Sequence, residues 1–328
     1  MKLRRVIKGD TRRVQAYSNG YWVSVDRVEG FASTAAGRSM TPRGDDELLG
    51  ILNLDKKTRE SLQAKLDQLE PEQDEDSKPI LPFHPASFRD FMLYEKHVVD
   101  STRGYVKRFI PHLYPITQLV EKLSGKPFPR FRPHALWYKQ PIYYLSNHLN
   151  FKVSGDEVSW PSYTKALDYE LEIGAVITKP LFNASTEEAA AAIGGFVVLN
   201  DVSARDVQKD EMESGFGPQK AKHFVSTMSA VVVSADEVQD QLESLVATIS
   251  INGNEVAECN TRGMHFEIAE AVAFASKDEQ LHPGELFGSG TIPGGTGMEN
   301  DHWLAPGDTV SLRIHGIGEV TNTMGDAG

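Results

Sequence analysis

Two glutamates lie two positions apart in the segment DYELEIGAVIT, which covers residues 168–178. Side chains alternate between the two faces of a β-strand, so Glu170 and Glu172 are expected on one face, with Cβ atoms about 6–7 Å apart. Two anions this close to each other and near a hydrophobic core are costly to bury unless a cation compensates their charge. A hard divalent cation, such as Mg²⁺ or Ca²⁺, binds carboxylate oxygens and would provide this compensation. On spacing alone, a solvated edge strand explains the pair better, because Glu-x-Glu is common.

A third carboxylate follows the next apolar run. Residues 196–199 are Phe-Val-Val-Leu, and the run ends at an Asn-Asp pair that contains Asp201. Carboxylates at strand ends lie at the rim of a sheet, where functional sites tend to form. Asp201 is therefore expected to join the two glutamates as an oxygen ligand. In the polar loop that follows, Arg205 and Asp206 are expected to form an ion pair with a structural role.

These carboxylates need a strand-rich frame to position them. The segments that predict strands cover residues 167–178, 195–201, 224–233, 246–258 and 304–322. Two segments between them predict helices, namely residues 185–194, which begin with a Ser-x-x-Glu capping box, and residues 264–277, which are amphipathic. The pattern predicts an α+β, β-rich domain with few helices, built around a mixed sandwich or barrel-like sheet.

A change of composition near residues 71–80 predicts a domain boundary, because proline and acidic residues gather there and apolar residues are few. Before it, residues 1–40 contain short strand-like pieces and residues 45–69 have helical periodicity. We therefore expect a small N-terminal domain or arm over residues 1–75. The larger domain, which carries the carboxylates, is expected over residues 76–328.

Composition limits the partners and the location. The chain has 328 residues and a net charge of −12, which argues against nucleic acid as a partner. No apolar run approaches the roughly 18 residues that span a bilayer, and the N-terminus lacks the apolar core of a secretory signal. The single cysteine, Cys259, excludes an internal disulfide and is expected to be a packed or surface residue. These features predict a cytoplasmic protein without membrane partners.

Four ordered motifs resemble those of the fumarylacetoacetate hydrolase family. They are LDYELEIGAVI, VLNDVSARDVQ, GPQKAKHFVSTMSA and LFGSGTIPGGTG, and the resemblance covers residues 80–328. It implies a β-rich catalytic domain of the family's own type, in a protein that is usually a homodimer. It also implies a small-molecule keto-acid substrate and a divalent cation, Mg²⁺ or Ca²⁺, with Mn²⁺ as an alternative.

The same resemblance implies roles for particular residues. The matching metal ligands are Glu170, Glu172 and Asp201, and the upstream segment FRDFMLYEKHVVD adds Asp90 as a fourth. In that segment His97 matches the catalytic base. Asp100, three residues after the histidine, stands where smaller family members carry an acid, and it is expected to orient the imidazole.

Further positions match groups that handle the substrate. Lys222 matches the active-site lysine, with Lys220 as the competing choice. Tyr144, with its neighbour Tyr143 as an alternative, Gln208 and Thr291 match substrate-contacting residues. Glycines around Thr291 would let backbone N–H groups approach a carboxylate closely.

One position departs from the pattern of fumarylacetoacetase, since Met92 stands where that enzyme has a substrate-contacting tyrosine. Fumarylacetoacetate itself is therefore in doubt as the substrate.

The expected reaction is hydrolysis of a C–C bond in an acylpyruvate, an acylacetoacetate or a related β-diketo acid. The metal would stabilise the enolate that leaves, while His97 activates water. A decarboxylase, hydratase or isomerase of a small 2-oxo acid is the first alternative. A non-catalytic, metal-stabilised binding protein is the second, although stability alone would not require His97 and Lys222.

Overall fold

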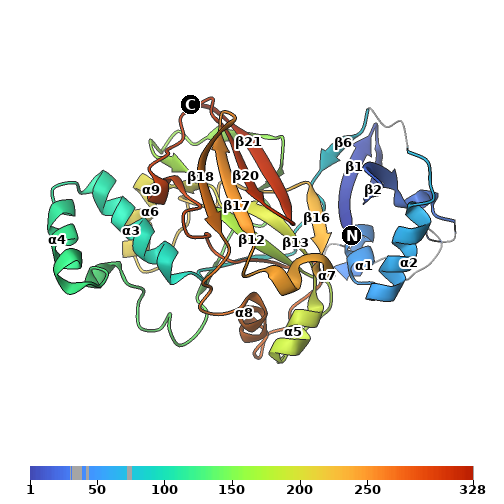
Figure 1. Ribbon diagram of the computed structural model, residues 1–328, viewed down its shortest axis with the longest axis horizontal. Coiled ribbons are helices and arrows are strands. Elements are labelled where there is room, and N and C mark those ends of the chain that lie inside the picture. Colours follow the sequence, from blue (N-terminus) through green and yellow to red (C-terminus); the bar gives the residue numbers. More distant parts are fainter. Residues whose placement is uncertain (30, 32–38, 42–43, 72–75, 328) are drawn as a thin grey trace.

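Strands dominate the computed structural model, which describes residues 1–29, 31, 39–41, 44–71 and 76–327 (Figure 1). Among these residues the strands form one large sheet, one five-stranded sheet and two small two-stranded sheets. The strand order of the large sheet is open at both ends, so no barrel closes within the described part of the chain. The strand-rich α+β class predicted from the sequence is confirmed.

The large sheet contains both parallel and antiparallel pairs of strands. Its main path runs β3 (Tyr21–Ser24), β2 (Thr11–Ser18), β1 (Lys2–Lys8), β16 (Val231–Ser234), β13 (Ile193–Asn200), β12 (Leu171–Ile177), β19 (Leu286–Gly288), β7 (Phe88–Phe91) and β8 (Tyr143–Leu145). Off this path, β6 (Lys78–Ile80) pairs with β1, β15 (Ser226–Met228) pairs with β13, and β9 (Phe151–Val153) pairs with β15.

The second sheet has the order β10 (Glu157–Trp160), β21 (Gly318–Ala327), β20 (Thr309–Ile314), β17 (Val246–Ile251) and β18 (Asn254–Asn260). The two small sheets pair β11 (Leu167–Asp168) with β14 (Ser203–Ala204) and β4 (Ser39–Thr41) with β5 (Gly44–Asp46).

Helices surround these sheets. They are α1 (Glu47–Leu52), α2 (Lys56–Leu66), α3 (Glu95–Phe109), α4 (Tyr114–Ser124), α5 (Thr186–Ala192), α6 (Arg205–Glu213), α7 (Ala235–Val238), α8 (Ile268–Ala275) and α9 (Gly297–Asn300), with 3₁₀ turns η1 (Val25–Arg27), η3 (Pro129–Phe131) and η4 (Gln239–Gln241). The helix α8 is shorter than the expected 264–277, because residues 264 and 265 instead bond to the backbone of residues 93 and 94.

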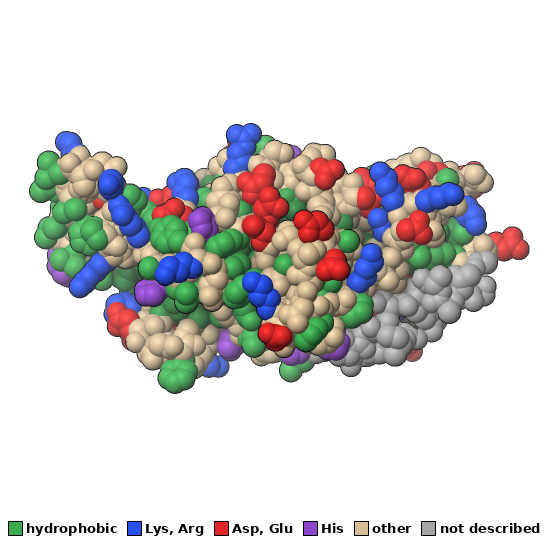
Figure 2. Space-filling model, turned by 90° about the horizontal axis from the view of Figure 1, so that it is seen from below, with side chains coloured by type: hydrophobic (Ala, Val, Ile, Leu, Met, Phe, Trp, Pro, Cys, Tyr) green, Lys and Arg blue, Asp and Glu red, His purple; other side chains and the backbone are tan. Residues whose placement is uncertain are grey.

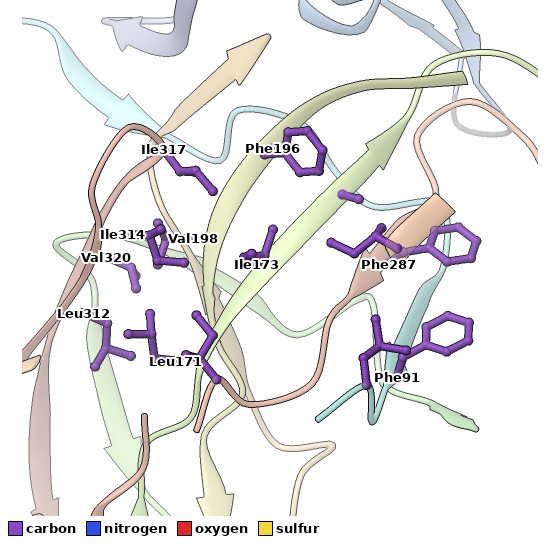
Figure 3. Packing of buried hydrophobic residues seen from close by; sticks show 14 of the residues in the cluster. Phe91, Leu171, Ile173, Phe196, Val198, Phe287, Leu312, Ile314, Ile317 and Val320 are labelled. Atoms are coloured by element: carbon purple, nitrogen blue, oxygen red, sulfur yellow. The ribbon is translucent and has the colours of Figure 1, made fainter. Parts of the chain in front are cut away.

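The alternation of β12 separates two hydrophobic cores. Leu171 and Ile173 face the first core, where they meet Leu312 and Ile314 of the five-stranded sheet (Figure 3). Val176 points to the opposite face and belongs to the second core. Because β12 is buried on both faces, its backbone is held rigidly, which suits a strand that positions charged groups at one end.

The N-terminal strands extend the large sheet. β1 pairs antiparallel with β16, with Lys2 opposite Val233. The second core accordingly mixes Leu3 and Leu49 with Val197 from β13. The predicted boundary between residues 1–75 and 76–328 stays a prediction, and part of the acidic run there lies outside the described residues.

The helix α4 forms the opposite end of the molecule (Figure 1). It presents apolar side chains to solvent, including Ile116, Leu119 and Leu123, and Figure 2 shows apolar side chains gathered at this end. The homodimer implied by the resemblance stays a prediction. Within the described residues, no helix has the length and apolar character needed to cross a membrane.

Candidate active site

Three buried carboxylates meet at one face of the large sheet. Asp90 belongs to β7, Glu172 to β12, and Asp201 follows β13 directly. One carboxylate oxygen from each lies within 4.8 Å of the others. We call these three residues the carboxylate trio. They come from strands that are close neighbours in the sheet, so the trio depends on strand order and not on a continuous motif.

Gly288 in β19 gives the trio its room. It lies opposite Asp90 in the parallel pairing of β19 with β7. A Cβ atom at position 288 would lie 2.5 Å from Asp90 Oδ1 and 2.8 Å from Glu172 Oε2. Any side chain at this position would therefore push the two carboxylates apart, and glycine is required for close approach rather than for a turn.

The trio has the properties of a divalent-cation site. Asp90 Oδ1 and both carboxylate oxygens of Glu172 are buried, and no described residue donates a hydrogen bond to them. Burial, and then the neighbouring carboxylates, raise the pKa of Asp90 and of Glu172 well above the usual range. Unpaired buried anions are costly, whereas a hard cation prefers such a set of oxygens. The trio therefore fits Mg²⁺, Ca²⁺ or Mn²⁺ and does not select among them.

Glu170 lies beside the trio but in a different environment. Its Oε1 is 2.7 Å from the Arg205 guanidinium, and its Oε2 accepts a hydrogen bond from Lys222. Although burial opposes ionisation, Lys222 and Arg205 lower the pKa of Glu170. From the sequence, Glu170 and Glu172 were expected to be equivalent ligands. In the structure, the side chains of Lys222 and Arg205 already neutralise Glu170. Its role as a metal ligand stays a prediction.

Lys222 and Tyr144 both bond to Asp201. The ammonium group of Lys222 bridges Asp201 and Glu170, and the Tyr144 hydroxyl donates to Asp201 Oδ2 at 2.5 Å. Burial opposes the charge on Lys222, but the two carboxylates prevail and raise its pKa. The competing candidate Lys220 lies elsewhere, with Nζ 5.2 Å from the ring centre of Tyr163.

The acid beside His97 is not the expected one. His97 is buried near the start of α3, and its Nδ1 contacts Glu299 of α9. The other carboxylate oxygen of Glu299 accepts the N–H of Gly294 at 2.5 Å. The expectation for Asp100 is corrected, because its carboxylate pairs with Lys96 and Arg103. Glu299 lies 202 positions from His97, so no local spacing could identify it.

Arg205 anchors a second buried network that the sequence did not reveal. Its Nε donates to Asp168 at 2.8 Å, and its terminal nitrogens donate to Gln208 Oε1 at 2.9 Å and Thr296 Oγ1 at 2.8 Å. Asp168 in turn accepts the N–H of Gly297, the first residue of α9, at 2.9 Å. This network fixes the helix that carries Glu299.

The expected ion pair between Arg205 and Asp206 does not form, because each residue has other partners. Asp206 instead accepts from the Thr164 hydroxyl at 2.5 Å and from the Lys165 N–H at 2.8 Å. Arg205 faces inward because Asp168 and Glu170 are both on that side. The segment expected to be a polar loop is largely helical, because Arg205 is the first residue of α6.

One cavity of about 260 Å³ collects most of the predicted site residues. Its lining includes Asp90, Glu170, Glu172, His97, Lys222, Tyr143, Tyr144, Gln208 and Thr291. Substrate contacts for Tyr144, Gln208 and Thr291 stay predictions. A larger hollow of about 630 Å³ is lined by Asp100, Cys259 and Glu299 and lacks the carboxylate trio. Burial raises the pKa of the Cys259 thiol to about 12, which disfavours a nucleophilic thiolate.

Comparison with known proteins adds independent evidence. A family model described as fumarylacetoacetate (FAA) hydrolase, C-terminal, matches residues 117–325. The 2,4-didehydro-3-deoxy-L-rhamnonate hydrolase of Sphingomonas sp. (strain SKA58) is 30% identical over 181 residues, which is 55% of this chain and 63% of that protein. A mitochondrial oxaloacetate tautomerase of Xenopus laevis is 30% identical over 187 residues, which is 57% of this chain and 58% of that protein.

The chain thus spans less than two thirds of the length of each of these two relatives. Among solved structures, a fumarylacetoacetate hydrolase from the psychrophile Exiguobacterium antarcticum superposes with a TM-score of 0.67 at 19% identity, covering 99% of both chains. This likeness shows a shared fold.

Proposed function

The chain belongs to the fumarylacetoacetate hydrolase family. On this premise we propose that it hydrolyses a C–C bond in a β-diketo acid, such as an acylpyruvate, and that it needs a divalent cation to do so. One observation carries the proposal: His97, whose Nδ1 contacts Glu299, lines the same cavity as Asp90 and Glu172 of the trio. A histidine held by a carboxylate beside a hard-cation site combines a base with a place for developing negative charge.

The trio would hold the cation, with Glu170 as the candidate fourth ligand. A bound cation would supply Lewis-acid stabilisation for an enolate oxygen. The chain's own contribution is to keep these carboxylates close together and dehydrated, which Gly288 and the buried faces of β7 and β12 achieve.

His97 is placed to move protons. Glu299 accepts the Nδ1 proton, so Nε2 remains to take a proton from water. The water oxygen then bonds to the acyl carbonyl carbon, and the adjacent C–C bond breaks to give a carboxylic acid and an enolate. The imidazolium returns its proton to the enolate carbon, which completes hydrolysis. Lys222 stays cationic and would stabilise oxygen anions formed nearby.

The test is an assay of acylpyruvates by NMR, with EDTA and then with added Mg²⁺. Cleavage should stop in EDTA and return with Mg²⁺, and His97→Ala should lose it. Full activity in EDTA would contradict the cation's role, and full turnover by His97→Ala would remove the proposed base. Cation binding without turnover of any keto acid would favour a binding protein.

Tautomerisation of a 2-oxo acid is the second candidate, and the similarity to an oxaloacetate tautomerase supports it. Such a reaction needs proton transfer at carbon but no water attack, so His97 would suffice as the base. Oxaloacetate in D₂O discriminates the two reactions. Enzyme-dependent deuterium entry at C3 without C–C cleavage of acylpyruvates would indicate a tautomerase, whereas cleavage products would indicate a hydrolase.

A further inference from the structure

The cavity beside the trio changes character along its length. The charged residues that line it are Asp90, Glu170, Glu172, Arg205, Lys222 and the titratable His97. The remaining lining includes three methionines, Met92, Met212 and Met298. Two walls show how the charged and apolar groups are ordered.

The first wall is α6. Arg205, Gln208 and Met212 occur at i, i+3 and i+7, which places them on one face of the helix, and all three line the cavity. Arg205 contacts Glu170 at 2.7 Å, whereas Met212 is 49% exposed. At 1.5 Å per residue, Met212 lies about 10 Å farther along the helix axis than Arg205. The wall therefore runs from a salt-bridged inner end to an apolar outer end.

The second wall is the end of β7. Asp90 lies in β7 and Met92 directly follows this strand. Both line the cavity, and about 6–7 Å of extended backbone separates them. Asp90 is buried in the trio, while Met92 is 37% exposed at the mouth. The Met92 N–H donates to Ile142 O at 3.1 Å, which brings another apolar lining residue to the same end.

No cation lines the outer end among the described residues. The guanidinium of Arg205 forms ion pairs with Asp168 and Glu170. The ammonium of Lys222 forms ion pairs with Glu170 and Asp201. Two nearby lysines do not line the cavity and have other contacts: Lys209 bonds to Glu213 at 3.0 Å, and Lys220 lies over Tyr163. A second carboxylate on a substrate would thus lose water at this end without gaining a cationic partner.

We propose that the cavity selects monocarboxylic 2-oxo or 2,4-dioxo acids with an apolar, uncharged tail over dicarboxylic acids of the same length. The proposal rests on the proposed function, because it assumes that the 2-oxo acid head lies at the trio. Methionines suit such a tail because their flexible side chains adapt to different apolar shapes. Each methylene that leaves water should tighten binding about three- to fourfold. A terminal carboxylate should weaken it about tenfold or more.

Binding of matched ligands tests this selectivity without requiring turnover. Calorimetry with Mg²⁺ present would compare pyruvate, 2-oxopentanoate, 2-oxoheptanoate and the diacid 2-oxoheptanedioate. We expect affinity to rise along the monoacid series and the diacid to bind at least tenfold more weakly than 2-oxoheptanoate. Equal or tighter binding of the diacid would overturn the proposal. If the monoacids bind as expected but no acylpyruvate is cleaved, the hydrolase function fails while the selectivity stands.

A charge-insertion variant locates the selectivity. Met212→Lys should reduce the preference for 2-oxoheptanoate over the diacid by about tenfold, because it places a cation at the outer end. Met212→Gln, of similar length but uncharged, should not improve diacid binding. Phe182→Lys adds the same charge at an exposed position outside the cavity and should leave the preference unchanged. An unchanged preference in Met212→Lys would refute the assignment of α6 as the outer wall.

Discussion

Two buried polar clusters lie side by side in this molecule, and they differ in how fully their hydrogen-bonding groups are paired. Around Asp168 and Arg205, carboxylate and guanidinium are both saturated by each other, by Thr296 and by the N-terminus of α9. In the carboxylate trio, three buried oxygens lack a donor among the described residues. A paired network braces a fold, whereas unpaired buried anions indicate a site built for something that binds.

Glu170 connects the two clusters. It shares Arg205 with the first and Lys222 with the second, through Asp201. We therefore expect opposite consequences from changing Glu172 in β12 and Asp168 in β11, although these carboxylates lie only four residues apart in the sequence. Loss of charge should remove function in the trio and stability in the paired network.

The largest effect is expected from Glu172→Gln. The amide keeps the shape but removes a ligand charge, so Mg²⁺ affinity and catalytic activity should fall about 10³-fold or more. In EDTA the variant should be no less stable than wild type, because a costly unpaired anion has gone. Calorimetric titration with Mg²⁺ and thermal unfolding in EDTA measure the two effects. Normal Mg²⁺ binding would contradict the assignment of Glu172 as a ligand.

Asp168→Asn should show the reverse pattern. It leaves the buried Arg205 guanidinium with one charge partner fewer, and removing one partner of a buried pair costs about 3–5 kcal/mol of unfolding free energy. The loss should be the same with and without Mg²⁺, as measured by urea unfolding. A variant as stable as wild type would show that the paired network does not brace α9.

The three residues of the trio are among the four ligands expected from the sequence, with Asp90 coming only from the family resemblance. The residues that support the trio were missed, and the reason is physical. Glu172 and Asp201 can be recognised in the sequence because each is a charged residue at the end of an apolar strand. Glu299 carries no such signal, since it meets His97 only after α9 packs against α3. The same holds for Asp168, whose contact with Arg205 depends on how β11 pairs with β14.

The fold shows the same division. Strand alternation and the capping box at Ser185 are local, and both appear where the sequence predicts them. The pairing of β1 with β16 joins residues more than two hundred positions apart, and no local pattern specifies such a partner. The fold class and several elements were therefore predictable. The helices α3, α4 and α6 were not predicted, and neither was the joining of the N-terminal strands to the large sheet.

Exchanging the acids near His97 sharpens the comparison within the catalytic cavity. Glu299→Gln should lower kcat about 10²-fold with little change in KM, because the imidazole loses the negative charge that stabilises its protonated form. Asp100→Asn is the matched control, and its effect should stay within about twofold, since Asp100 pairs only with Lys96 and Arg103 among the described residues. Steady-state kinetics with an acylpyruvate measure both. A larger loss in Asp100→Asn would reinstate Asp100 as the orienting acid.

The smallest effect is a pH dependence. The raised pKa values of Asp90 and Glu172 in the cation-free protein mean that cation binding displaces protons. Apparent Mg²⁺ affinity should therefore rise with pH below those pKa values, by up to about tenfold per pH unit for each proton released. Cation-free protein should lose stability as pH rises above the ordinary carboxyl range, since its folded state holds these protons more tightly. Titrations in buffers of different ionisation enthalpy count the protons, and no release would argue against raised pKa values.

Direct observation of a cation tests the central claim best. Crystals soaked in Mn²⁺ and measured near the manganese absorption edge give an anomalous peak wherever the ion binds. We predict one strong peak within about 2.0–2.6 Å of oxygens from Asp90, Glu172 and Asp201, and its loss in Glu172→Gln. A trio without a peak in crystals that bind Mn²⁺ elsewhere, or a peak unaffected by Glu172→Gln, would contradict the account.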